Sequence, residues 1–456
     1  MFSSRCSTII APATVVGESG IAILRISGSL SLSFLKQYFN PRNNTQSFAS
    51  HRLYLGYLVD RDHKIIDEIM AVYMEPGRSY TYEPVVELHC HGSPQVVKEI
   101  ITLAQHYGID LAQPGEFTYR AFINGRLDLT QAEAVCRLIH SKSDFSRRAA
   151  INQMDGFLSR QISQIVMRIR QHIAYLEAWI DFPEEDIPEQ NFAELVNDIK
   201  CINDEVGRLT ESYHVGQIVA DGASVVLAGL PNSGKSSLLN ALLKRDRAIV
   251  SDIPGTTRDT IEEALIVNGL KISLADTAGL RHTTDPVEQL GVMKSYRKLE
   301  AADLILFLHD AAQPFSSALT DLMNRRPQTP LILVLTKTDL VQTVPSTTSF
   351  FDGSVCTVSS VTGDGLQELM TLMSDTLFAD FAGHSEAPLV TERRHYDTLI
   401  KSKTALDRFV ENSDNMTLDL LVSDLRQALI SFEYVTGSVT TDDILDDIFS
   451  NFCIGK

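Results

Sequence analysis

The segment 229–236 has residue types and a spacing that can bind the phosphates of a nucleotide. It reads Gly-Leu-Pro-Asn-Ser-Gly-Lys-Ser and fits the pattern G-x-x-x-x-G-K-[ST] without a gap. The glycines let backbone N–H groups surround the phosphates, and the helix that follows adds positive potential at its N-terminus. Lys235 would contact the β- and γ-phosphates during catalysis, and the Ser236 hydroxyl would bind Mg²⁺. A chance glycine turn is the alternative, but the apolar stretch before the segment and the helical stretch after it favour a phosphate-binding loop.

A second motif, Asp-Thr-Ala-Gly at 276–279, also follows an apolar stretch. Asp276 would support the Mg²⁺ shell, and the Gly279 N–H would contact the γ-phosphate. Ras-like proteins place a glutamine next to orient the attacking water, but this chain has Leu280, which cannot do so. Glu288 is a candidate for that role; the alternative is an ordinary solvated helix glutamate.

A third motif, Thr-Lys-Thr-Asp at 336–339, predicts that the base is guanine. The Asp339 carboxylate can accept hydrogen bonds from guanine N1–H and the 2-amino group, a donor pair that adenine lacks. Lys337 would lie along the base plane, and the Ser359–Ser360 pair could offer a backbone N–H to guanine O6. GTPases usually have Asn where this chain has Thr336, and a hydroxyl replaces only part of an amide's hydrogen bonding, so we expect a lowered nucleotide affinity.

These motifs require strands that end where the ligand binds. Between about 221 and 377 apolar strands alternate with helical stretches, which indicates a parallel α/β sheet. Such sheets bind ligands at the carboxyl ends of their strands. The predicted strands are 224–228, 271–275, 304–309, 331–336 and 355–358.

The rest of the chain has two other patterns. Short β-rich segments with one helix predict an α+β domain before about 120, and apolar residues at helical spacing predict helices from 129 to 180 and near the C-terminus. The predicted fold class is multidomain, with α+β, helical and Ras-like P-loop GTPase parts. The predicted boundaries are 1–120 for the α+β domain, 121–218 and 379–456 for the two parts of a helical domain, and 219–378 for the GTPase (G) domain.

Composition excludes some classes of protein. The 456 residues carry a formal net charge of −18, which disfavours a non-specific nucleic-acid binder. No apolar run reaches the roughly 20 residues of a membrane-spanning helix, so no membrane association is expected. The six cysteines show no metal-binding or paired spacing, which fits a reduced, cytoplasmic protein.

Several segments together resemble the bacterial tRNA-modification GTPase MnmE (TrmE) family over the whole chain. They are GLPNSGKSSLLNAL, SDIPGTTRDT, DTAGLR, PGEFTYRAFINGRLDLTQAEAV, AWIDFPEED and the terminal FCIGK. The resemblance implies an N-terminal domain that dimerises and binds a tetrahydrofolate one-carbon derivative, and a helical domain with the G domain inserted. It also implies a flavoprotein partner, MnmG (GidA), in a hetero-oligomer that adds an aminomethyl-type group at C5 of wobble uridine in tRNA.

The resemblance also implies roles for single residues. A potassium site would use Asn232, Ser251, Ile253 and Thr256. Thr257 would be the second Mg²⁺ ligand beside Ser236, and Glu288 would serve hydrolysis. The folate site would use Arg25, Glu87, Arg126 and the terminal Lys456, although Arg25 and Glu87 could instead form a structural ion pair. Two departures lie near that site: Tyr82 replaces a family glycine, and Arg126 stands where Lys is usual.

The predicted GTP site as a whole comprises five segments. They are Asn232, Ser233, Gly234, Lys235, Ser236 and Ser237; Ser251, Asp252, Ile253, Pro254, Gly255, Thr256 and Thr257; Asp276, Thr277, Ala278 and Gly279; Thr336, Lys337, Thr338 and Asp339; and Ser359 and Ser360.

Other functions remain open at this level. A regulatory or ribosome-assembly GTPase would share the nucleotide motifs, but such proteins typically carry a basic RNA-binding appendage, and none is visible in the sequence. A folate-binding transferase with a degenerate G domain is weaker, because Lys235 and Asp276 are intact.

Overall fold

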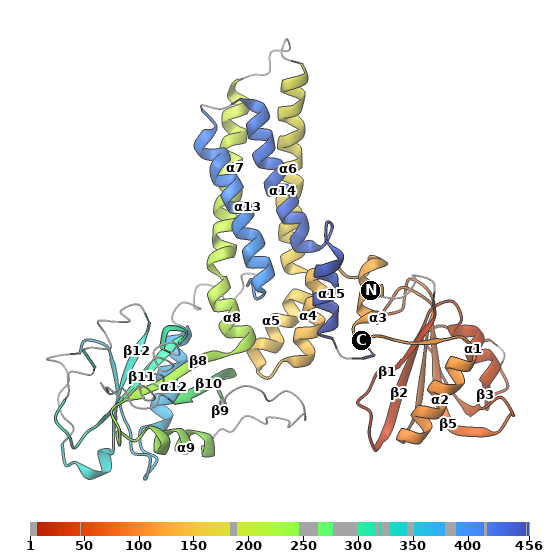
Figure 1. Cartoon of the computed structure of the whole chain (residues 1–456), viewed down its shortest axis with the longest axis horizontal. Helices are drawn as coiled ribbons and strands as arrows, with labels where there is room; N and C mark the ends of the chain where they lie inside the picture. Colours follow the sequence, from red (N-terminus) through yellow and green to blue (C-terminus); the bar gives the residue numbers. More distant parts are fainter. Residues whose placement is uncertain are drawn as a thin grey trace, which may run out of the picture. The chain divides into compact units, whose positions relative to one another are not determined.

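The fold is described from a computed structural model of the chain, over residues 7–45, 47–182, 189–245, 263–276, 299–315, 319–320, 329–343, 351–378, 389–414, 417–452 and 454–455. The chain divides into two compact units, whose helices and strands are labelled in Figure 1. The first contains Met1–Cys136, Gln153–Ile199 and Thr404–Lys456, and the second contains Arg137–Asn152 and Lys200–Lys403.

The first unit contains a seven-stranded sheet in the order β3-β4-β5-β6-β2-β1-β7. All its pairs are antiparallel except β1 with β7. Its strands are β1 (Ile9–Pro12), β2 (Ser19–Ser27), β3 (Phe39–Pro41), β4 (Leu53–Val59), β5 (Ile65–Met74), β6 (Val85–Gly92) and β7 (Asp110–Leu111). With helices α1 (Ser31–Tyr38) and α2 (Pro94–His106), the sheet forms the predicted α+β domain.

Alternation along the strands gives this sheet two different faces. Leu24 of β2 and Leu88 of β6 are fully buried in a core shared with α1 and α2. Side chains one residue away along each strand point to the opposite face. Arg25 and Glu87 therefore share the face that α1 and α2 do not cover, and the strand register places them directly opposite each other.

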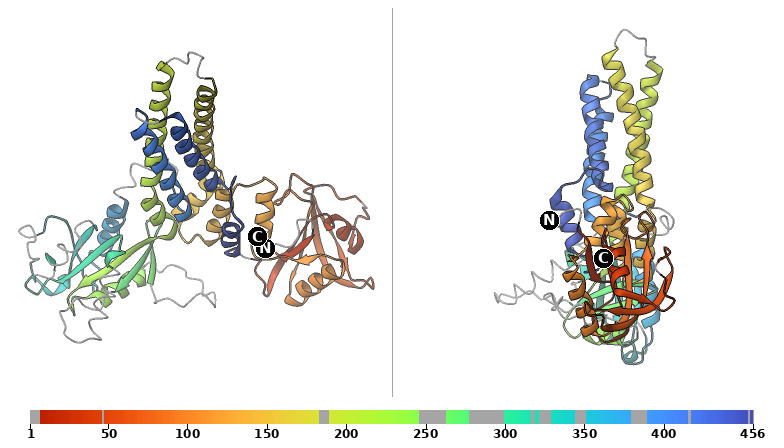
Figure 2. Two further views of the ribbon diagram at one scale, coloured as in Figure 1. Left: turned by 45° about the horizontal axis from the view of Figure 1, so that its top comes forward. Right: turned by 90° about the vertical axis from the view of Figure 1, so that its right-hand side faces the viewer.

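The helices of the first unit follow the predicted apolar spacing. In α6 (Phe157–Asp181) a stripe from Leu158 through Ile165 to Leu176 is buried at intervals of three and four residues. Helix α6 runs beside α14 (Leu418–Thr436) in both views (Figure 2). Also present are α3 (Glu116–Ile123), α4 (Leu129–His140), the start of α7 (Glu189–Glu211), the end of α13 (Arg393–Asn412) and α15 (Asp442–Ser450).

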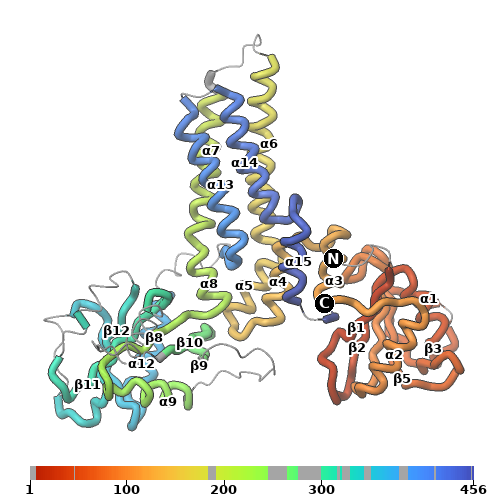
Figure 3. Tube along the Cα trace, in the orientation of Figure 1, coloured from red at the N-terminus to blue at the C-terminus, as the bar shows by residue number. Residues whose placement is uncertain are grey.

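The second unit contains the predicted α/β sheet, with six strands in the order β13-β12-β11-β8-β10-β9. Its strands are β8 (Ala223–Gly229), β9 (Glu263–Val267), β10 (Leu270–Asp276), β11 (Leu304–Asp310), β12 (Leu331–Thr336) and β13 (Ser354–Thr357). The five strands predicted from the sequence are confirmed within one or two residues. Strand β9 was not predicted; it forms an antiparallel hairpin with β10 at the edge. The tube in Figure 3 traces β8 to β12 together with helices α9 (Lys235–Arg245) and α12 (Leu366–Phe378).

Arg137, in the last turn of α4, contacts the chain segment just before this sheet begins and the segment that follows it. Its Nη1 lies 2.9 Å from Asp221, the last residue of α8 (Tyr213–Asp221), just before β8. Its Nε contacts Glu392, and Nη2 donates to Thr391 O at 3.2 Å, just before α13. Burial opposes the charged form, but the two carboxylates outweigh it and raise the pKa of Arg137.

Helix α5 (Asp144–Met154) contacts helix α12 of this unit: Phe145 packs against Phe378 with ring centroids 4.9 Å apart. Among the described residues, no helix has both the length and the apolar character needed to cross a membrane.

Candidate functional site

The phosphate-binding loop connects β8 to α9 through backbone conformations that most residues avoid. Gly229, Asn232 and Gly234 have positive φ angles of 147°, 62° and 93°. A Cβ at Gly229 would lie 2.5 Å from the carbonyl oxygen of Leu308 on the neighbouring strand, so only glycine fits. The sequence motif therefore forms a tight loop that leads directly into the N-terminus of α9.

The polar groups of this loop suit an anionic ligand. Lys235 is buried and its Nζ donates to the carbonyls of Gly229 at 3.1 Å and Leu230 at 2.9 Å. Ser236 and Ser237 are exposed in the first turn of α9. The Ser233 hydroxyl is buried and has no hydrogen-bond partner among the described residues. The Lys235 ammonium and the helix N–H groups suit the phosphates of a nucleotide, and the exposed hydroxyls suit a Mg²⁺ ion bound to those phosphates.

Thr336 connects the base-reading motif to this loop. Its side chain is 1% exposed, and Oγ1 lies 2.7 Å from Ser233 O and 3.2 Å from His309 O. A hydroxyl has one hydrogen to donate, so the shorter contact, to Ser233, is the stronger. The threonine thus forms a direct hydrogen bond from the end of β12 to the phosphate-binding loop.

Lys337 is held by a residue that the sequence did not single out. Its backbone is left-handed, with φ 57°, and its Nζ lies 2.7 Å from Asp310 Oδ2 at the end of β11. Burial alone would raise the pKa of Asp310, but Lys337, the N–H of Ala312 and the charge of His309 together outweigh it and lower the pKa. The sequence shows only that Asp310 follows the predicted strand 304–309; its pairing in register with Thr336 is seen in the structure alone.

Ser359 positions the carboxylate of Asp339, which the sequence predicts to recognise guanine. Its hydroxyl donates to Asp339 Oδ1 at 2.6 Å and accepts N–H groups from Val361 at 3.3 Å and Thr362 at 3.2 Å. Its own N–H donates to Asp364 O at 3.0 Å. Within the predicted serine pair, Ser360 is therefore the better donor for guanine O6, and the role of Ser359 is to orient Asp339.

Part of the predicted GTP site lies outside the described residues. Asp276 ends β10 at the same sheet edge as Gly229 and Thr336. Its side chain, the segments 251–257 and 277–280, and Glu288 are not described. All the Mg²⁺ and potassium ligands and the hydrolysis glutamate stay predictions.

A second cluster lies on the open face of the N-terminal sheet. Arg25 and Glu87 form an ion pair, with Nε and Nη2 at 2.9 and 2.8 Å from Oε1. Nε2 of His89 lies 3.6 Å from the other Glu87 oxygen and is buried without a hydrogen-bond partner among the described residues. Burial raises the pKa of Glu87, but His89 and Arg25 outweigh it, so the pKa is lower than usual. An unsatisfied buried ring nitrogen beside an ion pair fits a polar ligand.

Other predicted folate residues lie at the same place. Both Arg25 and Arg126 lie against the ring of Tyr80, with their Cζ atoms 5.4 and 5.0 Å from its centroid. Arg25 Nη1 also lies 3.5 Å from the carbonyl of Gly455, the residue before Lys456, which itself lies outside the described residues. The structure thus brings Arg25, Glu87 and Arg126 together beside the C-terminal tail. Tyr80 was missed by the sequence analysis, because the two arginines that meet at its ring lie far from it along the chain.

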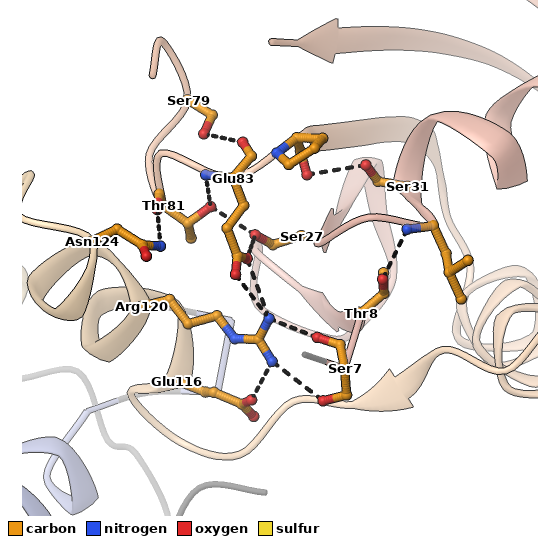
Figure 4. A network of polar contacts seen from close by, with 12 residues as sticks. Ser7, Thr8, Ser27, Ser31, Ser79, Thr81, Glu83, Glu116, Arg120 and Asn124 are labelled. Atoms are coloured by element: carbon orange, nitrogen blue, oxygen red, sulfur yellow. Dashed lines mark hydrogen bonds and ion pairs between the residues drawn. The ribbon is translucent and has the colours of Figure 1, made fainter. Parts of the chain in front are cut away.

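The loop that carries Tyr80 is held by a buried polar network (Figure 4). At its centre Arg120 contacts Glu83 at 3.2 Å and Glu116 at 2.8 Å. The hydroxyl of Ser27 joins Glu83, at 2.6 Å, to Thr81, at 2.7 Å. The side chains of Arg120 and Glu116 are only 8% and 4% exposed, so each charge depends on its partners.

Comparison with known proteins finds relatives along the whole chain. Residues 8–126 match the family described as GTP-binding protein TrmE N-terminus, and residues 129–453 match the MnmE helical domain. A tRNA modification GTPase MnmE from Syntrophotalea carbinolica is 42% identical over 456 residues, covering 98% of this chain and 99% of that protein. One from Geotalea uraniireducens is 43% identical over 452 residues, with the same coverage.

Among solved structures, the G domain of the T. maritima FeoB iron transporter matches with 28% identity and a TM-score of 0.28, covering 35% of this chain and 98% of that domain. The two full-length relatives and the two family matches cover both the nucleotide loop and the N-terminal sheet. This chain therefore belongs to the MnmE family of tRNA modification GTPases.

Proposed function

We propose that this GTPase acts within an enzyme complex that adds an aminomethyl-type group at C5 of wobble uridine in tRNA. One observation carries the proposal. A single chain combines a guanine-nucleotide site, in which Thr336 joins the base-reading strand to the phosphate loop, with a separate cluster of Arg25, Glu87 and Arg126. A GTPase that acts only as a switch has no need of the second site.

In the GTP site, binding and selection of the nucleotide fall to different residues. The loop N–H groups and Lys235 would bind the phosphates, and Asp339, oriented by Ser359, would select guanine. Ser236 and Thr257 would hold Mg²⁺, which neutralises phosphate charge. Glu288 would orient water in place of the missing glutamine.

A potassium ion would take the place of an arginine finger, whose positive charge stabilises the transition state of phosphoryl transfer. Asn232, in its left-handed conformation, lies in the phosphate loop where its side-chain oxygen can serve such an ion. Backbone and side-chain oxygens of Ser251, Ile253 and Thr256 would complete the site.

In the N-terminal site, the donor set fits a tetrahydrofolate derivative, which would supply the one-carbon unit. Glu87 can accept hydrogen bonds from the amino and N–H groups of a pterin ring. Arg25, paired with Glu87, would keep that carboxylate charged at the pterin end, and Arg126 and Lys456 can bind the anionic glutamate part. The charge on Glu87 is secured by its lowered pKa, so it would be available as an acceptor at neutral pH.

Three partners complete the proposal. A flavoprotein, MnmG in this family, would supply the redox steps, because the sequence carries no dinucleotide-binding fingerprint. The tRNA would be a substrate of the whole complex and places it in the cytoplasm. A second copy of the chain would pack on the open face of the N-terminal sheet, where Leu53, Leu55 and Met70 are 52%, 45% and 37% exposed.

Analysis of tRNA nucleosides from cells with and without this protein tests the function. We expect the modified wobble uridine to disappear in its absence and to return with the wild-type gene. The purified protein alone, given GTP, a folate one-carbon donor and tRNA, should leave uridine unmodified until the flavoprotein is added. Unchanged nucleosides together with a ribosome-assembly defect would refute the proposal and favour a regulatory GTPase.

A further inference from the structure

The ring of Tyr80 has an arginine from each of two distant segments against it. Arg25 comes from β2, and Arg126 follows α3, yet both guanidinium carbons lie within 5.4 Å of the ring centroid. The Tyr80 hydroxyl forms a hydrogen bond of 2.9 Å with Thr118 of α3. Burial raises the pKa of Tyr80, against the effect of Thr118 and the arginines, so the phenol stays neutral and the contact is of the cation–π kind.

The two arginines differ in what else holds them. Arg25 is fixed independently by its ion pair with Glu87. Arg126 is exposed, and among the described residues no carboxylate lies within ion-pair distance of it; its other contact is a hydrogen bond of 3.3 Å to Ser79 O. Both contacts of Arg126 are therefore made to the loop 79–84, at Ser79 and Tyr80.

Contacts from several side chains fix the conformation of that loop. Arg120 holds Glu83, Ser27 holds Thr81, and Asn124 donates to the carbonyl of Thr81 at 2.8 Å. The contacts maintain Tyr82 in a left-handed conformation, φ 60°, that a side chain of this size normally avoids. Strain of this kind persists only where surrounding structure imposes it, and it is typical of binding sites.

We propose that Tyr80 is a positioning residue of the folate site: it holds the guanidinium of Arg126, which has no carboxylate partner among the described residues, beside Arg25, where it can receive the anionic part of a reduced folate. The inference rests on the proposed folate binding and adds a residue that acts through the arginines. Without the ring, Arg126 would regain its side-chain freedom and would have to be ordered by the ligand at the expense of affinity.

Equilibrium binding of 5-formyltetrahydrofolate to the full chain, followed by calorimetry, tests this role. We expect Tyr80→Leu to weaken binding about tenfold, which corresponds to ~1.4 kcal/mol, whereas Tyr80→Phe keeps the ring and should stay within about threefold of wild type. Phe157→Leu is the matched control, because Phe157 lies under Arg160 in the same unit, with Cζ 5.9 Å from the ring centroid, away from this cluster. It should bind as wild type does.

Coupling to Arg126 separates positioning from a general loss of structure. Arg126→Met and Tyr80→Leu combined should cost less than the sum of the single changes, since both remove the same guanidinium from the site. Unfolding midpoints and GTP binding report whether each variant is folded. The inference is overturned if Tyr80→Leu binds like wild type, if Tyr80→Phe binds as poorly as Tyr80→Leu, or if the two changes are additive. Absence of binding by the wild-type protein would instead overturn the folate part of the proposed function.

Discussion

Replacing Thr336 with valine tests how the base-reading strand supports the phosphate loop. The change keeps the branched shape and removes the hydroxyl that lies 2.7 Å from Ser233 O. Because this site is 1% exposed, water cannot replace the lost donor, and an unsatisfied buried acceptor costs about 1–3 kcal/mol. The backbone carbonyl has a second lone pair, so we expect the lower part of that range, ~1–2 kcal/mol.

This free energy should appear in two measurements. Denaturant unfolding without nucleotide reports the loss of stability, and titration with a fluorescent GTP analogue reports the loss of affinity. Since ~1.4 kcal/mol is a factor of ten, the affinity should fall by at most about 5- to 30-fold. Thr336→Ser keeps the hydroxyl and is the control. If valine leaves both quantities unchanged, or if serine is as damaging as valine, the hydrogen bond does not support the loop.

Further predictions concern the base, the ion and the tail. Asp339→Asn should weaken GTP binding by about 1–3 kcal/mol and improve the relative affinity for xanthosine triphosphate; unchanged GTP affinity would contradict the assignment of the base-reading residue. Hydrolysis should be faster in potassium than in sodium at equal ionic strength and should require paired G domains; Asn232→Ala should remove the salt difference, and Glu288→Ala should abolish turnover with GTP binding retained. Equal hydrolysis rates in the two salts, measured on monomeric wild-type protein, would contradict the proposed potassium site. Gly455→Ala places a Cβ 2.0 Å from the carbonyl of Pro12 at φ 96°, so the tail should leave Arg25 and be trimmed faster by carboxypeptidase; an unchanged trimming rate would show that the tail is not anchored there.

Local patterns predicted the nucleotide loop and the sheet well. The segment 229–236 contains its own turn residues, and each motif follows an apolar strand, so chain order alone places them at one sheet edge. Asp310 was missed because its importance depends on which strand lies beside β12, a question of register that no local pattern answers.

The N-terminal cluster shows the same limit. Resemblance identified Arg25 and Glu87 but could not decide between an ion pair and a ligand site. The structure shows an ion pair that leaves a buried nitrogen of His89 unsatisfied beside it. Tyr80 lies in a loop whose conformation depends on Arg120, 40 positions further along the chain, so no short-range rule could place its ring.

Arg137 affects how the G domain is inserted between the helices on either side of it in the chain. The chain leaves α8 at Asp221 and returns at Thr391 and Glu392, and one guanidinium binds both places. Residues 222–390 therefore leave and rejoin the surrounding helices at one place, as a surface loop with neighbouring ends would. Their length matters little to that junction, because lengthening a closed loop adds only slowly to its entropic cost. A whole catalytic module could in this way be acquired at one position, or exchanged for another, while the helices around Arg137 kept their packing.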